Sequence, residues 1–274
     1  MTEVHIIALL CTGLVQGLSS GVLGTGGGWI TTPVQYWVYQ DMGIAPDLAI
    51  RMAFATGLLA MLPAGAASAW GHHRRSAVWW KPALVMGICG LAGSFSGATL
   101  ATHVSATPLK VVFGVAVLAV GFMMLVSTPS PRGPRPRENA PLWAACAFPI
   151  TFLAGMIGVG GGLFMVPVMV LLFHFPMHMA VATSVATVAA ISIGGMLGYV
   201  VNGMGVAGIP SPSVGYVYVW GWLCLVGTGV LMTQVGVSIA HRLPARTLAW
   251  VFSAAALYIG LRMIGLFEWL DWPL

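Results

Sequence analysis

A glycine cluster that occurs twice constrains this chain more than any other feature. The first copy spans residues 24–28 and reads Gly-Thr-Gly-Gly-Gly, with Pro33 five residues after it. The second copy spans 158–162 and reads Gly-Val-Gly-Gly-Gly, with Pro167 at the same spacing. Glycine in a helix interior costs about 1 kcal/mol relative to alanine, so consecutive glycines interrupt a helix. The pattern predicts a duplicated unit whose copies are each broken at the glycines.

Neither glycine cluster fits a nucleotide-binding loop. The dinucleotide fingerprint needs a glycine at its sixth position, where Trp29 and Leu163 stand. A P-loop needs Gly-Lys-Ser/Thr, and no such triplet follows either cluster. The role of both clusters must therefore be inferred from the apolar sequence that surrounds them.

Composition identifies that surrounding sequence as membrane-embedded. The 274 residues are 58% hydrophobic and 6% charged, against roughly 25% charged in soluble domains. We therefore predict an all-α, polytopic transmembrane protein in a lipid bilayer, with no cofactor and no metal site. The net charge of +5 is attributed to basic residues in loops on the cytoplasmic side of the membrane, and not to a nucleic-acid-binding surface. Apolar runs of about 20 residues, long enough to span a bilayer, are 5–23, 52–70, 78–101, 109–126, 179–201, 215–240 and 247–270.

Shorter apolar runs flank the clusters and complete two repeats. The runs 29–39 and 163–175 follow the two clusters, and 142–157 precedes the second. The predicted organisation is a first repeat over 1–127, a Pro/Arg-rich cytoplasmic linker over 128–140 and a second repeat over 141–274. Equivalent positions in the two repeats are Thr56 with Thr183, Gly57 with Ser184 and Arg51 with His178.

Charge placement predicts that the two repeats are inverted. Lys and Arg concentrate in cytoplasmic loops, which places the basic loop 71–76, the linker and Arg242 inside. The equivalent loop of the second repeat, residues 202–213, is uncharged and is placed on the periplasmic side. Inversion requires an odd number of crossings per repeat, either three plus a re-entrant hairpin or five. Both versions place the two termini in the periplasm.

The glycine clusters are the predicted substrate site. Non-helical backbone at membrane depth is tolerated where it is buried or lines a cavity. The helices that begin after the clusters present free N–H groups and a positive dipole end, which suits an anion. The alternative is that the glycines only allow close helix packing. The predicted substrate-binding residues are Gly24, Thr25, Gly26, Gly27, Gly28, Arg51, Thr56, Gly158, Gly160, Gly161, Gly162, His178, Thr183 and Ser184.

Each polar residue of that set has its own expected role. Thr56, Thr183 and Ser184 could donate hydroxyl hydrogen bonds to an oxyanion or hold membrane helices together. Arg51 and His178 are expected near the outer ends of their helices, either attracting the anion or snorkelling to the interface. None of the six acidic residues lies in the middle of an apolar run, which disfavours metal-cation transport and a buried carboxylate relay.

The motifs together resemble a known family. The doubled glycine cluster with its proline, the Ala-Thr-Gly/Ser helix of each repeat and the His-Arg-Arg loop before Val78 and Trp79 are similar to the TauE/SafE family of sulfite and organosulfonate exporters. The resemblance covers nearly the whole chain. It implies an inner-membrane protein that moves sulfite, sulfoacetate, another organosulfonate or thiosulfate. Gly57 stands where members often carry Ser, so this chain lacks one hydroxyl of a symmetric pair.

The expected function is secondary transport of a small sulfur-containing anion, bound near the bilayer midplane between the glycine clusters. One alternative is a membrane assembly or partner-binding subunit that does not transport. A second is a membrane-embedded enzyme of sulfur metabolism, which the absence of HExxH and GxSxG motifs disfavours. The anion, the direction of transport, the coupling ion (proton or sodium) and a homo-oligomeric state stay open.

Overall fold

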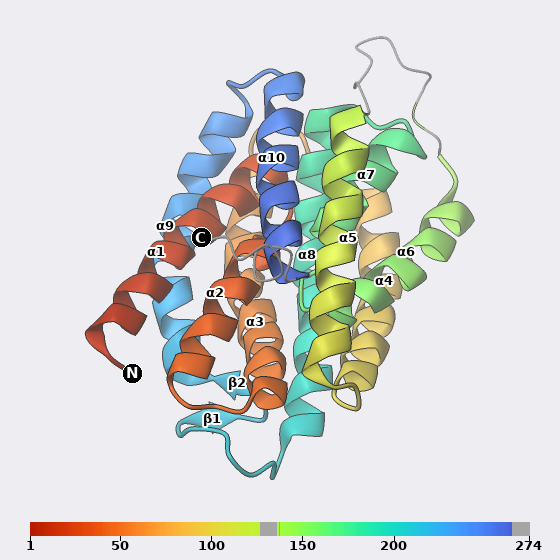
Figure 1. The fold of residues 1–274 in the computed structure, drawn as a ribbon. Coiled ribbons are helices and arrows are strands. Elements are labelled where there is room, and N and C mark those ends of the chain that lie inside the picture. The colour runs from red at the N-terminus through yellow and green to blue at the C-terminus, as the bar shows by residue number, and fades with distance from the viewer. Residues whose placement is uncertain (127–135, 137, 265–274) are drawn as a thin grey trace.

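The computed structural model of the chain describes residues 1–126, 136 and 138–264. The predicted linker over 128–140 therefore lies largely outside the described residues. The described elements are α1 (Glu3–Leu23), α2 (Gly28–Asp41), α3 (Pro46–His73), α4 (Trp80–Ala101), α5 (Ala106–Val126), α6 (Ala140–Met156), α7 (Gly162–Leu171), α8 (Met177–Gly203), β1 (Ser213–Val214), β2 (Val217–Tyr218), α9 (Val219–Ala240) and α10 (Ala245–Met263) (Figure 1).

Local sequence signals set several helix ends. Thr2 and His5 form a capping box at the start of α1, which satisfies amides that lack a partner in the first turn. The side chain of Asn139 accepts a hydrogen bond from the Leu142 amide at the start of α6. Gly24 ends α1 in the left-handed conformation, with φ of 69°. The first glycine cluster is therefore a helix terminator.

The prediction of an all-α polytopic membrane protein is confirmed. Within the described residues, α1, α3, α4, α5, α8 and α9 are long and apolar enough to cross a membrane. Large apolar side chains also face outward, with Leu231 73% and Ile88 72% exposed. Such a surface is suited to hydrocarbon and not to water.

Each glycine cluster lies at the tip of a helical hairpin. His5 Nε2 at the start of α1 is 2.7 Å from Asp41 Oδ2 at the end of α2, so this pair of helices returns to where it began. In the second half, Trp143 near the start of α6 contacts Phe175 just beyond α7, with ring centroids 6.3 Å apart. With 14 residues in α2 and 10 in α7, the returning arms are about 21 and 15 Å long. Both are shorter than the hydrocarbon core of about 30 Å.

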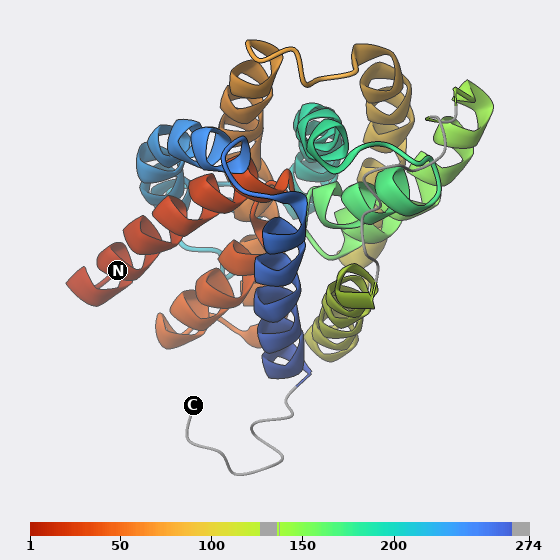
Figure 2. The same cartoon turned by 90° about the horizontal axis from the view of Figure 1, so that it is seen from above.

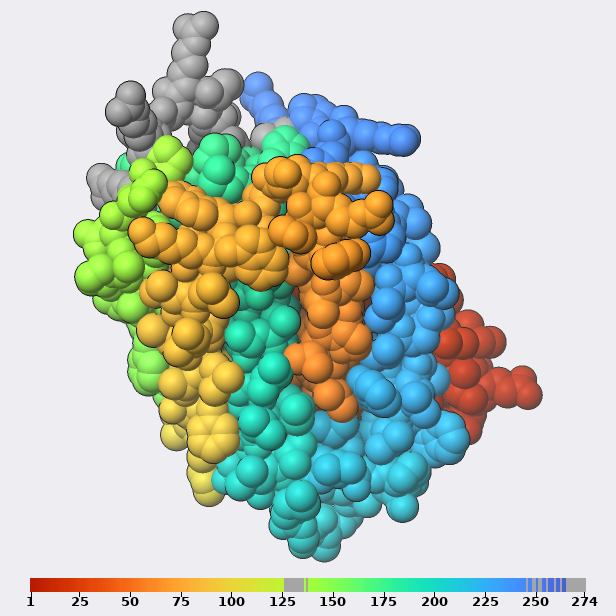
Figure 3. Space-filling model, turned by 180° about the vertical axis from the view of Figure 1, so that it is seen from behind, coloured from red at the N-terminus to blue at the C-terminus, as the bar shows by residue number. Residues whose placement is uncertain are grey.

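The hairpin of each half packs against a helix of the other half. Helix α1 packs along α9, and α6 packs along α4, so each hairpin lies against a helix of the opposite half. Small residues permit these contacts, since Gly17 of α1 lies against the backbone of Gly229, and Gly155 of α6 against that of Ser94. The hairpins occupy opposite sides of the molecule (Figure 2), and α8 lies between α3 and α4 (Figure 3).

The central helices α3 and α8 run in opposite directions. His72 in the last turn of α3 and His178 in the first turn of α8 both contact His241, with centroids 5.2 and 6.1 Å away. The α3–α4 connection therefore lies at the same end of the molecule as the α9–α10 connection, while the segment 204–218 lies at the other end (Figures 1 and 3). The tips of both hairpins meet in the interior between these ends.

Candidate anion site between two glycine loops

The first glycine loop (24–28) and the second glycine loop (158–162) have the same backbone conformation. At the first, third and fourth positions, φ is 69°, 77° and 80° in the first loop and 67°, 71° and 80° in the second. These angles fall in the left-handed region, which glycine adopts without the steric cost that a Cβ brings. Gly27 and Gly161 are the N-caps of α2 and α7. The sequence repeat is therefore a structural repeat at these loops.

The two loops are in direct contact with each other. A Cβ on Gly28 would lie 2.9 Å from Val159 Cα and 3.0 Å from the Gly158 carbonyl oxygen. A Cβ on Gly162 would lie 2.8 Å from Thr25 Cα. Real Cβ contacts are almost never so short, so both positions require glycine for the loops to touch. All residues of both loops are buried.

Ser184 connects the two loops. Its hydroxyl oxygen lies 3.1 Å from the Gly24 carbonyl oxygen and 3.4 Å from that of Gly162. The one hydroxyl hydrogen is within reach of both buried carbonyl oxygens, so Ser184 connects the two loops. At the equivalent position, Gly57 offers no hydroxyl, and a Cβ there would lie 3.3 Å from both Thr31 Oγ1 and Gln35 Nε2. Among the described residues, the hydroxyl that bridges the two loops therefore comes from the second half.

Helices α3 and α8 together cover the contact between the loops. Met61 Sδ lies 3.1 Å from a Cβ placed on Gly26 and closer still, at 2.6 Å, to one placed on Gly160. Val188 Cγ1 lies 2.9 and 3.5 Å from the same two positions. Each covering side chain thus touches both loops. Ser192 Oγ is 3.3 Å from the Cβ position of Gly160.

Backbone N–H groups are concentrated where the loops meet. Among the residues that the structure describes, none accepts a hydrogen bond from the amides of loop positions 26–28 and 160–162. Unpaired amides at the start of a helix, together with the positive end of the helix dipole, favour an anion. Here two helix starts, those of α2 and α7, converge from opposite sides of the molecule. This arrangement can bind an oxyanion through backbone donors from both halves.

Buried hydroxyl and amide side chains near the loops extend this polar environment. Within the described part of the chain, Gln16 Oε1, Thr32 Oγ1 and Ser192 Oγ are buried with no hydrogen-bond partner. Gln16 Nε2 also lies 3.5 Å from the Gly26 carbonyl oxygen. These residues are absent from the set predicted from the sequence. Gln16 and Thr32 carried a signal, because each is a polar residue in an apolar helix that adjoins the first glycine cluster. Ser192 carried none, because α8 reaches the second loop only in the folded structure.

The three threonines among the predicted site residues have structural partners. Thr56 Oγ1 accepts a hydrogen bond from the amide of Tyr218, the N-cap of α9, at 3.0 Å. Thr183 Oγ1 accepts one from the amide of Trp79, the N-cap of α4, at 3.1 Å. The equivalent threonines thus cap helices in opposite halves. Thr25 Oγ1 accepts from the indole nitrogen of Trp29 at 3.0 Å.

Arg51 and His178 do not join the loops. Arg51 Nη2 donates to the Val104 carbonyl oxygen at 3.0 Å, and its guanidinium carbon lies 6.0 Å from the centroid of the Tyr216 ring. His178 is instead at the opposite end of the molecule, stacked on His241. The expectation that both residues lie near the outer face is therefore wrong, because equivalent positions of antiparallel helices lie at opposite ends.

His178 belongs to a group of basic side chains at its end of the molecule. His72 Nδ1 is 3.1 Å from His241 Nε2, and Arg75 donates to the Val237 carbonyl oxygen at 2.8 Å. Burial, followed by the nearby Arg75 charge and then His178, lowers the pKa of His241. No group of three or more metal-ligating side chains occurs in the described residues. The cluster is a basic packing contact between α3, α8 and α9.

In the described residues, helices of membrane length with irregular backbone buried at two helix breaks are typical of membrane transporters. The family described as Sulfite exporter TauE/SafE matches residues 9–263, and the chain belongs to that family.

Relatives from distant organisms are similar over their whole length. The "Probable membrane transporter protein MJ0441" of Methanocaldococcus jannaschii is 26% identical over 263 residues, covering 93% of this chain and 94% of that protein. The "Probable membrane transporter protein YunE" of Bacillus subtilis is 24% identical, covering 94% and 97%. A "Probable membrane transporter protein" of Haemophilus influenzae is also 24% identical, with the same coverage. No solved structure matches the chain.

Proposed function

We propose that this protein is a secondary transporter of small sulfur-containing anions, sulfite or an organosulfonate, and that it binds them at a single site between the two glycine loops. The observation that carries the proposal is the contact of the loops, which gathers six amides at the starts of α2 and α7 that have no acceptor among the described residues. Sulfite and sulfonates present three oxygens on one sulfur. Two converging sets of amides suit such a group better than a single helix start does.

Energetics favours an anion at this position. Hydrogen bonds to a charged acceptor contribute roughly 1.5 to 3 kcal/mol each, and several are needed to replace the hydration of an oxyanion. A dry interior strengthens each of them. The only ion pair among the described residues, His5 with Asp41, lies at the open ends of the first hairpin, far from its tip. Neither loop contains an acidic residue, so no loop carboxylate repels an anion.

The covering side chains imply that the site opens and closes. Met61 is buried and fills the space against both loops, so the described state has no room for an anion there. Binding then requires movement of α3 or α8 relative to the hairpins, as alternating access does in transporters built from repeats. A flexible methionine is a suitable filler because it changes rotamer easily.

We further infer that the halves are inverted in an inner membrane, with both termini in the periplasm. The basic residues Arg74, Arg75 and Arg242 lie at the end of the molecule that holds the α3–α4 and α9–α10 connections. By the preference of Lys and Arg for cytoplasmic loops, this end faces the cytoplasm. The exchange of contacts between hairpins and opposite halves supports the inversion.

Cysteine labelling tests this topology. Ser76 and Ser211 are both exposed and lie in connections at opposite ends of the molecule. With the four native cysteines replaced, a cysteine at 76 is expected to react with an impermeant maleimide only from the cytoplasmic side, and one at 211 only from the periplasm. Labelling of both from the periplasm would contradict the inversion.

Flux through the purified protein tests the function. Proteoliposomes that contain only this chain are expected to accumulate ³⁵S-sulfite or a labelled sulfonate under an imposed proton or sodium gradient, and the gradient that works identifies the coupling ion. Unlabelled anions added in turn rank the substrates by competition. If no anion of the panel moves faster than in empty liposomes, the chain is not a transporter of these anions.

A further inference from the structure

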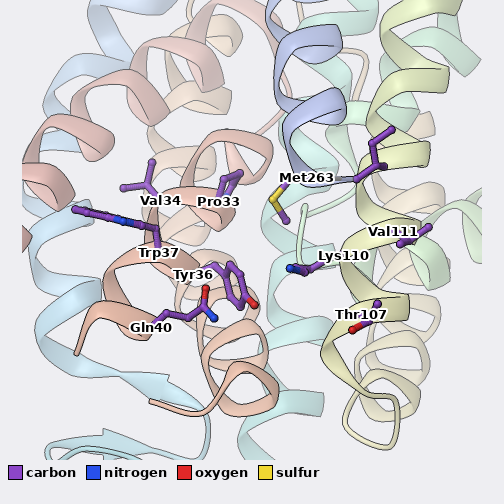
Figure 4. A pocket seen from close by; sticks show the side chains of 10 residues that line it. Pro33, Val34, Tyr36, Trp37, Gln40, Thr107, Lys110, Val111 and Met263 are labelled. Atoms are coloured by element: carbon purple, nitrogen blue, oxygen red, sulfur yellow. The ribbon is translucent and has the colours of Figure 1, made fainter. Parts of the chain in front are cut away.

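A pocket of about 650 Å³ opens on the outside of the molecule between α2, α5 and the end of α10 (Figure 4). It does not include the glycine loops, although Pro33 of the first glycine–proline motif lines it. Its walls come from the first hairpin on one side and from the peripheral pair of α5 and α10 on the other. In a bilayer such a pocket faces lipid, not the transport site.

Lys110 is the one cationic side chain among the described residues that line this pocket. Lys110 Nζ is 5.2 Å from the centroid of the Tyr36 ring, in a cation–π contact. In the part of the chain that the structure describes, no carboxylate forms an ion pair with it. Of the described acids, Asp41 is bound to His5, and Asp47 accepts a hydrogen bond from the Ala106 amide at 2.6 Å. The pocket therefore carries a positive charge with no described anionic partner.

Polarity changes along the length of the pocket. Gln40, in the last turn of α2, and Thr107, in the first turn of α5, lie with Lys110 toward the helix ends (Figure 4). Pro33 and Met263 lie further along, toward the middle of the molecule (Figure 4). A free anion gains nothing from the apolar part. An amphiphile with an anionic head and a hydrocarbon chain matches both parts.

We propose that this pocket binds an anionic phospholipid, with its phosphate on Lys110 and an acyl chain along the apolar wall. Trp37 is 49% exposed beside the pocket, and tryptophan prefers the level of the lipid headgroups. The ammonium group of a lysine between membrane helices can bind a lipid phosphate as a point charge. The bound lipid would fill the space between the first hairpin and the α5–α10 pair. The inference does not depend on the transported substrate.

Lipid retention by the purified full-length chain tests the site. The protein is reconstituted in vesicles of equal phosphatidylglycerol and phosphatidylcholine, extracted, and its retained lipid quantified by mass spectrometry. Wild type is expected to enrich phosphatidylglycerol at least ~10-fold, as a contact worth about 1.4 kcal/mol would produce. K110R should keep this enrichment, and K110Q should lose it. K81Q is the matched control, because Lys81 is the chain's other lysine and is exposed near the start of α4.

Two further arms distinguish a lipid in the pocket from a free anion held by Lys110 alone. V111W fills the pocket while it leaves Lys110 in place, so it should also lose the enrichment. Glycerol 3-phosphate carries the phosphate without chains, so millimolar concentrations should not displace phosphatidylglycerol. If K110Q enriches phosphatidylglycerol as strongly as K81Q does, Lys110 does not bind the lipid and the proposal is wrong. Displacement by glycerol 3-phosphate would make it a free-anion site and overturn the lipid.

Discussion

Alanine at Gly162 is expected to reduce anion transport strongly while the protein still inserts into the membrane. Gly162 is helical, with no positive φ, so the substitution brings no backbone strain. The added methyl would overlap the Gly24 carbonyl oxygen and lie 2.8 Å from Thr25 Cα. The two loops must then separate by a few tenths of an ångström or more, which displaces the amides from a shared anion. Gly28→Ala is expected to do the same from the other side.

Gly227 provides the control for both substitutions. It also lies inside a helix, α9, but a Cβ there would meet no heavy atom within 4 Å. Alanine at this position gains helix propensity and should leave flux unchanged. We expect G28A and G162A to reduce flux by more than ~10-fold relative to G227A, corresponding to about 1.4 kcal/mol or more. Flux by G162A equal to that by G227A, at equal insertion, would show that loop contact is not needed.

Alanine substitutions of two serines on α8 are expected to have different effects, one on anion affinity and the other on stability. Ser192 Oγ is buried beside Gly160 without a partner in the described residues. Ser192→Ala removes a group that folding leaves unsatisfied, so Tm should stay equal or rise. If this hydroxyl donates to the anion, the apparent KM should rise about 10-fold, as loss of one charge-assisted bond implies.

Ser184→Ala is expected to lower Tm, in contrast to Ser192→Ala. It removes the hydroxyl that donates to the buried carbonyl oxygens of Gly24 and Gly162, so the contact between the loops loses a hydrogen bond. That should lower stability by about 0.5 to 1.5 kcal/mol, measured as a lower Tm in detergent. A lower Tm for S192A, or an unchanged Tm for S184A, would mean that the roles of the two serines are assigned wrongly.

The fold was largely predictable because its strongest signals are local. Apolar length predicts membrane helices, and consecutive glycines predict where a helix stops. The choice between a hairpin and two crossings was not predictable. It depends on the depth of the glycine loops, which is set by the short returning arms α2 and α7 and by the contact of the two loops with each other.

The candidate site was predictable in its backbone and less so in its side chains. The glycine positions follow from the repeat itself, since both loops need the same left-handed torsions. Aligning the repeats also paired Thr56 with Thr183, but it could not show that their oxygens accept hydrogen bonds from N-cap amides of the opposite half. The role of Ser192 depends on the approach of α8 to the second loop, which no local pattern encodes.

Equilibrium binding of ³⁵S-sulfite to the purified protein tests the shared site most directly. If the two glycine loops form one site, wild type and G227A bind one anion per chain, and G28A and G162A each lose that binding entirely. Two anions per chain in wild type, with one retained by each loop variant, would show that the loops bind independently and would contradict a shared site.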